Sequence, residues 1–150
     1  MIRFKLYHTL VLLIVFVGLS SCKLGDNEKQ QPESNAETGL PEGFDDFYKR
    51  FHRDSLYQID HITFPLQGVE DFADTIDPNA PFYWERDEWI MHREIDLEEK
   101  GFNREIKALG YMVEETIRNA DNFGTIRRFY FADGEWNLVY YVGINPLARQ

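Results

Sequence analysis

The residues of this chain that could transfer protons are its few histidines and the acids beside them. Asp60 directly precedes His61, and an acid next to a histidine could donate and accept protons in a pocket. Neighbours on a strand point to opposite faces, however, so this pair would not act as one unit. The sequence therefore predicts no catalytic residue. An enzyme that uses Asp60, His61 or Arg127 is the alternative.

The sequence also contains no clear motif for binding a metal ion or a phosphate group. No second histidine stands four residues from His52, His61 or His92, the spacing that metal-binding helices use. The aspartates between residues 71 and 77 recur every third position, whereas the acids of a calcium loop alternate. The chain has no glycine-rich phosphate loop and no nucleophile elbow. We predict no metal and no cofactor.

The most distinctive pattern lies in TIRRFYFADGEWNLVYYVGI, residues 125–144. Asp133-Gly134 is a two-residue turn typical of a tight hairpin, and counting outward from it predicts which residues face each other. The predicted cross-strand pairs are Phe131 with Trp136, Phe129 with Leu138 and Arg127 with Tyr140.

Arg127 is a charged residue on the otherwise apolar face of this predicted hairpin. A guanidinium there must extend to solvent, pair with an acid or bind an anionic ligand. The opposite face is mixed, includes Arg128, Tyr130 and Tyr141, and suits either solvent or a shallow ligand cleft. Arg127, Arg128, Tyr130 and Tyr141 are therefore the candidate ligand-binding residues.

The single cysteine, Cys22, follows the long apolar run of the chain. As a helix, residues 10–19 would rise about 15 Å, which is half of the hydrocarbon core of a membrane. Basic residues precede this run and no acid does, which is the layout of a secretory signal. The run closes as LSSC, residues 19–22, which resembles the lipobox of bacterial lipoproteins.

The lipobox resemblance implies that residues 1–21 are a signal peptide and that the Cys22 thiol receives a diacylglycerol. Acylation of the new amino terminus would give three chains, of the palmitate kind, where stable anchoring needs at least two. The alternative is a secreted protein with an unpaired thiol in an oxidising compartment. We expect membrane lipid to be attached through Cys22 at the cell envelope. In lipoproteins of many Gram-negative bacteria the absence of Asp after the cysteine goes with transfer to the outer membrane, so with Lys23 at that position the resemblance implies the outer membrane.

Charge bears on the choice of partner. The chain has 16 Lys and Arg against 26 Asp and Glu, for a net charge of −10. Loss of residues 1–21 removes Arg3 and Lys5 and no acid, which leaves a net charge of −12. Binding to nucleic acids needs clustered basic residues, so we exclude DNA and RNA as primary partners.

Composition divides the mature chain into a tether and one domain. Residues 22–43 hold the lipidated cysteine and a polar stretch rich in Glu, Gln, Asn, Pro and Gly, which predicts disorder. Residues 44–150 form a single domain of ordinary small size. All aromatic residues except Phe4, Tyr7 and Phe16 lie in this domain. Such a load indicates either an aromatic core or a surface that binds a partner.

The domain opens with two predicted helices. An apolar stripe with helical spacing predicts a helix over about 44–53, and Asp54 and Ser55 are good caps for a second, short one. Alternation predicts a strand at 62–66, where Pro65 restricts it to an edge or a bulge, and a short strand at 82–85 follows.

Two later segments are ambiguous. Asp87 could cap a helix that runs to Arg93. Between residues 102 and 119, apolar residues at every third or fourth position fit a helix, but Gly110 interrupts them. The β-branched residues of the second half favour a strand over 111–118.

The stretch FDDFYKRFHRDSLYQIDHITFPL, with the helix and terminal hairpin that follow, resembles a family of bacterial lipoproteins of unknown function. That family is similar to the nuclear transport factor-like (cystatin-like) fold. The resemblance covers most of residues 44–147. It implies an α+β domain in which N-terminal helices pack on a curved antiparallel sheet that ends in a C-terminal β-hairpin. It also implies a pocket at the open end, and it transfers no catalytic residue.

Two functions follow as hypotheses. The first is a non-enzymatic binding module for an envelope protein, a glycan or a small ligand, motivated by the aromatic excess. The second is a hydrolase or isomerase that uses the cone-shaped pocket. A closed cavity with convergent polar groups favours the enzyme, and a cone filled by side chains favours the binding module.

Overall fold

A computed structural model describes residues 32–34, 39–73, 80–94, 96–97 and 100–147. These residues form a mixed α+β domain with two short helices and a six-stranded sheet. The helices are α1 (Phe44–Phe51) and α2 (Ser55–Asp60). The strands are β1 (Ile62–Val69), β2 (Phe82–Trp84), β3 (Phe102–Leu109), β4 (Met112–Asn119), β5 (Phe123–Ala132) and β6 (Glu135–Pro146).

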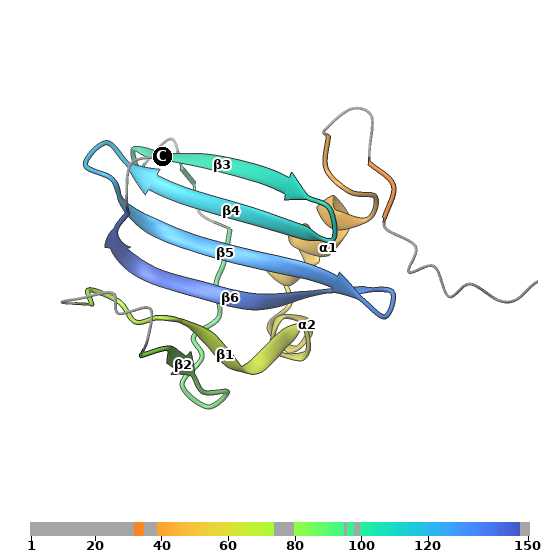
Figure 1. The fold of residues 1–150 in the computed structure, drawn as a ribbon, viewed down its shortest axis with the longest axis horizontal. Helices are drawn as coiled ribbons and strands as arrows, with labels where there is room; N and C mark the ends of the chain where they lie inside the picture. The colour runs from red at the N-terminus through yellow and green to blue at the C-terminus, as the bar shows by residue number, and fades with distance from the viewer. Residues whose placement is uncertain (1–31, 35–38, 74–79, 95, 98–99, 148–150) are drawn as a thin grey trace, which may run out of the picture. The chain divides into compact units, whose positions relative to one another are not determined.

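The sheet has the strand order β2-β1-β6-β5-β4-β3 (Figure 1). Among the described strands, β1 and β6 pair in parallel and the other neighbours pair antiparallel. The expected all-antiparallel sheet is therefore wrong at this pair. The reason is topological, because β1 and β6 lie far apart in the chain and no short hairpin fixes their direction.

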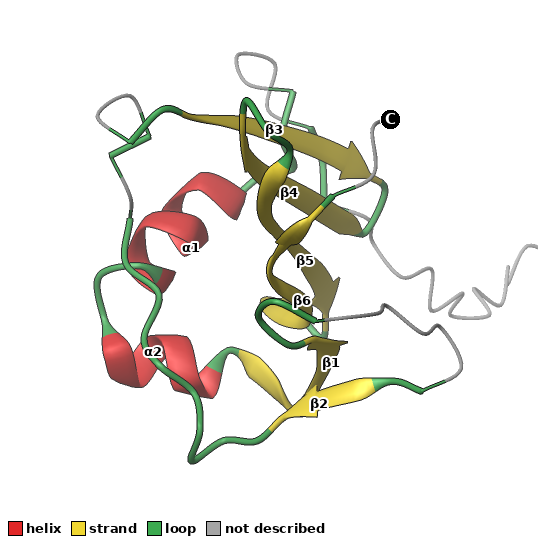
Figure 2. Cartoon of the chain, turned by 90° about the vertical axis from the view of Figure 1, so that its left-hand side faces the viewer, coloured by secondary structure: helices red, strands yellow, loops and turns green. Residues whose placement is uncertain are grey.

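Both helices lie on one side of the sheet (Figure 2). The connecting segment, which we define as residues 85–94 between β2 and β3, crosses the same side beside the helices (Figures 1 and 2). The domain thus has a layer of strands and a second layer made of α1, α2 and this segment.

The predicted helices are confirmed. The apolar stripe of α1 is buried as a unit and packs on the sheet, while acids occupy its first turn, where the helix dipole favours them. Asp54 caps α2 by accepting hydrogen bonds from the backbone nitrogens of Leu56 and Tyr57, both at 3.1 Å.

Aromatic residues of α1, β5 and β6 form much of the core. Phe44 and Phe51 contact Phe129 of β5 edge to face, each with ring centroids 5.5 Å apart, and Phe44 also contacts Trp136 of β6 at 5.1 Å. All four rings are buried. This favours the aromatic-core reading, and edge-to-face pairs of this kind each contribute about 1 kcal/mol beyond their buried area.

The strand predictions hold at β1 and β2, and the interruption by proline appears as an irregularity of the ladder. β1 lies between β2 and β6 rather than at an edge, but its register with β6 shifts between Ile62 and Gln67. Pro65 lies in this interval, after a cis peptide bond. A proline that cannot donate to the ladder is tolerated where the ladder is interrupted.

Residues 102–119 form a hairpin of two strands, so the strand favoured over 111–118 is confirmed and the helical stripe is wrong. Gly110 lies in the turn with φ 67°, a conformation that suits glycine. The stripe misled because Phe102 and Ile106 are four residues apart, an even number, which also places them on one face of a strand.

The predicted helix from Asp87 to Arg93 is wrong, since the connecting segment has no helical residue. Its backbone is held by Gln58 of α2, which is fully buried. The Gln58 side-chain oxygen accepts from the His92 backbone nitrogen at 2.8 Å and from Trp89 Nε1 at 3.0 Å. Its nitrogen donates to the carbonyls of Phe51 and His92, at 2.7 and 2.8 Å. These tertiary hydrogen bonds replace those of a helix.

The packed domain includes residues just before α1. Leu40 packs against the core and Pro41 is buried, and Pro41 forms an isolated bridge with Ser34. The signal peptide, Cys22 and most of the predicted tether lie outside the described residues.

Candidate functional site

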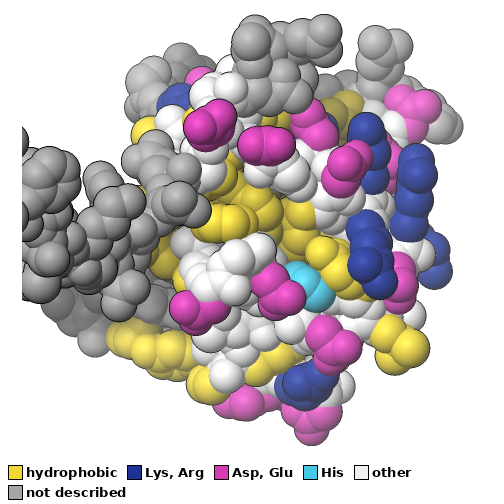
Figure 3. Space-filling view, turned by 90° about the vertical axis from the view of Figure 1, so that its right-hand side faces the viewer, with side chains coloured by type: hydrophobic (Ala, Val, Ile, Leu, Met, Phe, Trp, Pro, Cys, Tyr) yellow, Lys and Arg dark blue, Asp and Glu magenta, His cyan; other side chains and the backbone are white. Residues whose placement is uncertain are grey.

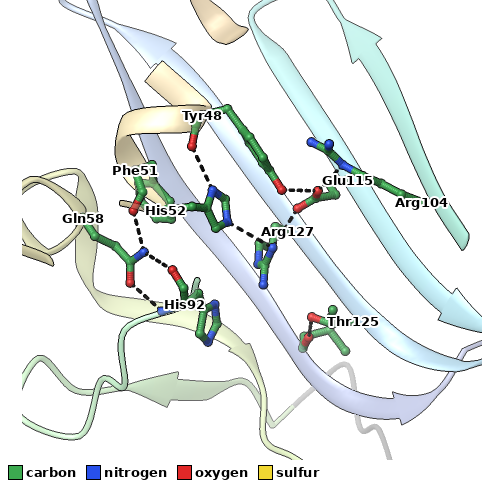
Figure 4. Close-up of polar contacts among 10 residues, drawn as sticks. Tyr48, Phe51, His52, Gln58, His92, Arg104, Glu115, Thr125 and Arg127 are labelled. Carbon is green, nitrogen blue, oxygen red and sulfur yellow. Dashed lines mark hydrogen bonds and ion pairs between the residues drawn. The ribbon is translucent and has the colours of Figure 1, made fainter. Parts of the chain in front are cut away.

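A group of polar side chains lies between the sheet, the end of α1 and the connecting segment (Figure 4). We call it the Arg127 cluster, and it consists of Tyr48, His52, His92, Arg104, Glu115 and Arg127. Strands β3, β4 and β5 each supply one residue of this cluster, α1 and its C-terminal end supply Tyr48 and His52, and the connecting segment supplies His92. The register of β3, β4 and β5 places Arg104, Glu115 and Arg127 on the inner face, with Glu115 directly opposite Arg127.

Glu115 is the centre of the hydrogen bonds. It is 1% exposed, and it accepts from Tyr48 Oη and Arg104 Nε, both at 2.6 Å, and from Arg127 Nη1 at 2.9 Å. Arg104 also lies over the Tyr48 ring, with its guanidinium carbon 4.2 Å from the ring centroid. Buried ions need partners of this kind, because the attraction must offset the loss of hydration.

His52 connects α1 to Arg127. Its Nδ1 lies 2.9 Å from the Tyr48 carbonyl oxygen and its Nε2 lies 3.4 Å from Arg127 Nη1. A carbonyl oxygen only accepts, so Nδ1 carries the proton, and in the neutral ring Nε2 is then the acceptor that faces Arg127. His52 is buried, and its ring lies tilted against Tyr48 with the ring centroids 4.1 Å apart.

His92 approaches from the connecting segment. Gln58 fixes its backbone, and its ring lies 4.4 Å from Trp89 and 4.7 Å from Tyr141 of β6, centroid to centroid. Trp84 completes an aromatic group around Tyr141, with ring centroids 5.4 Å apart.

Two polar atoms here are buried and have no hydrogen-bond partner among the described residues. They are Arg127 Nε and His92 Nδ1. The Arg127 side chain is only 5% exposed, so solvent hardly reaches it. Its guanidinium has five N–H donors, and the one on Nε is unused among the described residues. A buried polar group without a partner costs about 1 to 3 kcal/mol, and more when it is charged.

Burial sets the protonation of the cluster. It lowers the pKa of His92 to about 3 and also lowers the pKa of His52, in both cases with help from the Arg127 charge. Burial alone would raise the pKa of Glu115, but Arg127, the Tyr48 hydroxyl and Arg104 together hold it below its usual value. Burial and the Glu115 charge raise the pKa of Tyr48. At neutral pH the carboxylate is therefore ionised, the histidines are neutral and the tyrosine is protonated.

The structure brings together two of the four sequence-predicted binding residues. Arg127 lies opposite Tyr141, not Tyr140, because the β5–β6 register shifts between Arg128 and Phe129. The predicted pairs nearer the turn are correct, but this shift turns Tyr141 to the inner face, where it is 7% exposed.

Arg128 and Tyr130 lie on the outer face of the sheet, away from the cluster. Arg128 pairs with Glu114 at 2.7 Å and lies over the Tyr140 ring, 4.6 Å from its centroid. Tyr130 is 40% exposed and near Tyr111, with centroids 6.4 Å apart. A site at the Arg127 cluster therefore does not include these two residues.

The sequence reasoning missed Glu115, Tyr48 and the histidines of the cluster. Glu115 carried a usable signal, because it alternates with Val113 and Ile117 and is thus an acid on an apolar strand face, like Arg127 on its own strand. Tyr48 gives no separate signal, because its position fits the apolar stripe of α1. The approach of His92 has no local signal, since it depends on Gln58.

The Asp60 and His61 pair lies elsewhere. Asp60 is exposed and pairs with Arg86 at 3.2 Å, while His61 Nδ1 bonds the Tyr57 carbonyl at 2.8 Å and its ring stacks on Tyr57. Neither belongs to the Arg127 cluster. Within the described ranges, no group of three or more His, Cys, Asp or Glu side chains could hold a metal ion.

The described part of the chain shows no membrane-spanning helix and, on one side, a mixed surface. None of its helices has the length and hydropathy to cross a membrane. The side of the domain seen in Figure 3 has acidic side chains scattered among basic and apolar ones.

Comparisons with known proteins show a likeness to solved structures and none to a family model or a curated protein. No family model matches the sequence, and no curated protein matches it either. Among solved structures, the chain is similar to an NTF2-like protein from Bacteroides fragilis NCTC 9343, at 18% sequence identity and with a TM-score of 0.47. The match covers 73% of this chain and 48% of that protein, so this chain spans about half the length of its structural neighbour.

Proposed function

We propose that this chain is a lipid-anchored lipoprotein of the cell envelope whose domain binds a small ligand at the Arg127 cluster, without catalysis. The observation that carries the proposal is Arg127 itself. Its side chain is almost fully buried, yet its Nε has no partner among the described residues. A charged donor without a partner can bind an acceptor atom of a ligand. Because the donor is buried, it supports a small ligand over a protein or a glycan.

The protonation of the cluster supports binding over proton transfer. A general acid or base works best with a pKa near the working pH. Here burial and charge move the pKa values of His92, His52, Glu115 and Tyr48 away from neutrality. The groups of the alternative, Asp60 and His61, lie outside the cluster and form contacts of their own.

Native purification can test the binding role. The full chain is purified in detergent and precipitated with acid, and the small molecules released are identified by mass spectrometry. We expect a molecule in stoichiometric amount with the wild type and its loss from the double variant Glu115→Gln and Arg127→Gln. This variant removes both charges of the buried pair, and the Arg104 left without its carboxylate is partly exposed. Arg128→Lys, on the outer face, is the matched control and should retain the molecule. Equal release from all three proteins would contradict the proposal.

The anchor is tested separately, because the sequence LSSC alone supports it. Cells are grown with a palmitate analogue, and incorporation into the chain is measured. We expect label on the wild type and none on Cys22→Ala, which should also stay unprocessed or leave the membrane fraction. Label retained on Cys22→Ala would overturn the anchor and leave the binding role standing.

A further inference from the structure

We infer that the ligand of the Arg127 cluster is a small aromatic carboxylate, an inference that rests on the binding role proposed above. The carboxylate would accept a hydrogen bond from Arg127, and the ring would lie against the aromatic group around Tyr141. Three independent features of the cluster point to this chemistry: its charge, its donors and its neighbours.

The charge of the cluster favours a monoanion. Arg104 and Arg127 both donate to the one carboxylate of Glu115, at 2.6 and 2.9 Å. Arginine keeps its charge, whereas the two histidines are neutral because burial lowers their pKa values. The cluster thus has one more positive than negative charge, in a chain whose net charge is −10.

Two other acids of the inner and outer surroundings, Asp71 and Glu114, do not remove this excess. Asp71 is exposed and accepts from the Ile144 backbone nitrogen at 2.6 Å. Glu114, the neighbour of Glu115, points to the outer face and pairs with Arg128. A bound carboxylate would supply the missing negative charge, in a place where the local dielectric strengthens the attraction.

The donors favour an oxygen anion. Arg127 Nε–H has no partner, and a carboxylate is the natural acceptor for a guanidinium edge. His92 Nδ1 is also buried and without a partner, and in the tautomer with its proton on Nδ1 it is a second donor.

The neighbours favour a flat, apolar body. Tyr141 lies directly opposite Arg127, and around it stand His92, Trp89 and Trp84, with ring centroids 4.7, 5.4 and 5.4 Å from its own. The last three are half-buried rather than enclosed. Aromatic rings next to a cation match a ligand that joins a ring to a carboxylate.

Four probes separate these features in titrations of the nitrogen-15-labelled full chain in detergent. Benzoate has both the ring and the carboxylate, benzamide has the ring without the charge, acetate has the carboxylate without the ring, and inorganic phosphate is a different anion. We expect benzoate to shift the side-chain Nε–H signal of Arg127 with a dissociation constant on the order of 1 mM or tighter, and about tenfold tighter than acetate, benzamide or phosphate.

Variants test whether the binding occurs at this cluster. Arg127→Lys keeps the charge but moves the donor, and should weaken benzoate about tenfold, while Arg128→Lys on the outer face should leave it within about twofold. Glu115→Gln removes the competing carboxylate and should tighten benzoate severalfold. A network with only a structural role would not gain affinity in Glu115→Gln.

The outcomes separate this inference from the function on which it rests. Benzamide binding as well as benzoate, with loss in Arg127→Lys, would overturn the carboxylate and keep the binding role. Phosphate binding in preference to benzoate would replace the ligand class. No shift with any probe, together with no co-purified molecule, would overturn both. A benzoate effect that Arg127→Lys leaves unchanged would place the binding elsewhere and overturn the inference.

Discussion

At the scale of single residues, Glu115 decides whether the Arg127 cluster is stable. It holds three hydrogen-bond donors on two carboxylate oxygens in a place that is almost fully buried. The stability of such a group depends on all partners being present, because a lone charge in the interior is far costlier than none.

We therefore expect Glu115→Gln and Arg127→Gln each to lower the free energy of unfolding by about 3 to 5 kcal/mol, and the double variant by clearly less than the sum. Urea unfolding of the three variants measures this. Glu114→Gln is the control, because it breaks the more exposed pair with Arg128 and should cost about 1 kcal/mol or less. Additive losses would show that Glu115 and Arg127 do not depend on each other.

Stability should also fall on acidification. His92 has a pKa of about 3 in the folded chain and an ordinary value near 6.5 when unfolded, so between these values the unfolded chain binds a proton that the folded chain does not. Above pH 6.5 the ring is neutral in both states and does not change the stability. As pH falls from 6.5 towards 3, the free energy of unfolding decreases by up to about 1.4 kcal/mol per pH unit. His52, whose pKa is also lowered, acts in the same direction.

Urea unfolding at pH 7 and at pH 5 checks this expectation. The wild type should lose more stability between the two than His92→Gln, which has no proton to take up at this position. Equal losses in the two proteins would show that His92 does not stay neutral in the folded domain.

At the scale of the elements, the β5–β6 hairpin depends on its turn. Asp133 and Gly134 both have positive φ, 54° and 86°, as a two-residue hairpin turn requires. A Cβ at Gly134 would meet no atom within 4 Å, so a substitution there tests backbone strain without a clash. Gly134→Val should cost about 1 to 3 kcal/mol in urea unfolding.

The face assignment of the same hairpin gives a separate test. Trp136 lies in the core, and Trp136→Ala should cost about 3 to 5 kcal/mol. Counting from the turn puts Tyr141 on the outer face, where Tyr141→Ala would be nearly neutral. The register shift instead buries Tyr141, so we expect Tyr141→Ala to cost about 2 to 4 kcal/mol and Tyr130→Ala, on the outer face, less than about 1. Similar values for both tyrosines would contradict the inner position of Tyr141.

How far the sequence predicts the fold depends on how local each signal is. The stripe of α1, the Asp54 cap and the Asp133-Gly134 turn act within a few residues, and all three predictions are confirmed. The register shift beyond the turn, the path of residues 85–94 and the parallel pairing of β1 depend on contacts between distant segments. A single sequence does not specify these, and the candidate site depends on them: Arg127 was identified, but its partners were not.

At the scale of the whole molecule, the boundary between tether and domain can be tested by deletion. We expect deletion of residues 23–31 to leave the thermal midpoint within a few degrees, since their composition predicts no packing. Extending the deletion through Pro41 should lower it further, because Leu40 packs on the core and Pro41 is buried. Circular dichroism melts of the two deletions compare them. Identical midpoints would mean that the contact of Leu40 contributes nothing.

The parallel pairing of β1 with β6 also affects the order in which the domain folds. Gln67 pairs with Tyr140, so one edge of β1 can form its ladder only after the last strand is present. Strands β3 to β6, in contrast, are joined by successive hairpins that close short loops. Long-range pairing is slow because it pays its loop entropy before any contact forms. During synthesis β1 could therefore pair only with β2, through Leu66 and Trp84, and its other edge would stay unpaired until β6 has followed. Any factor that protects the nascent chain would be needed in that interval. The sheet would be complete only when β6 has been synthesised and can pair with β1.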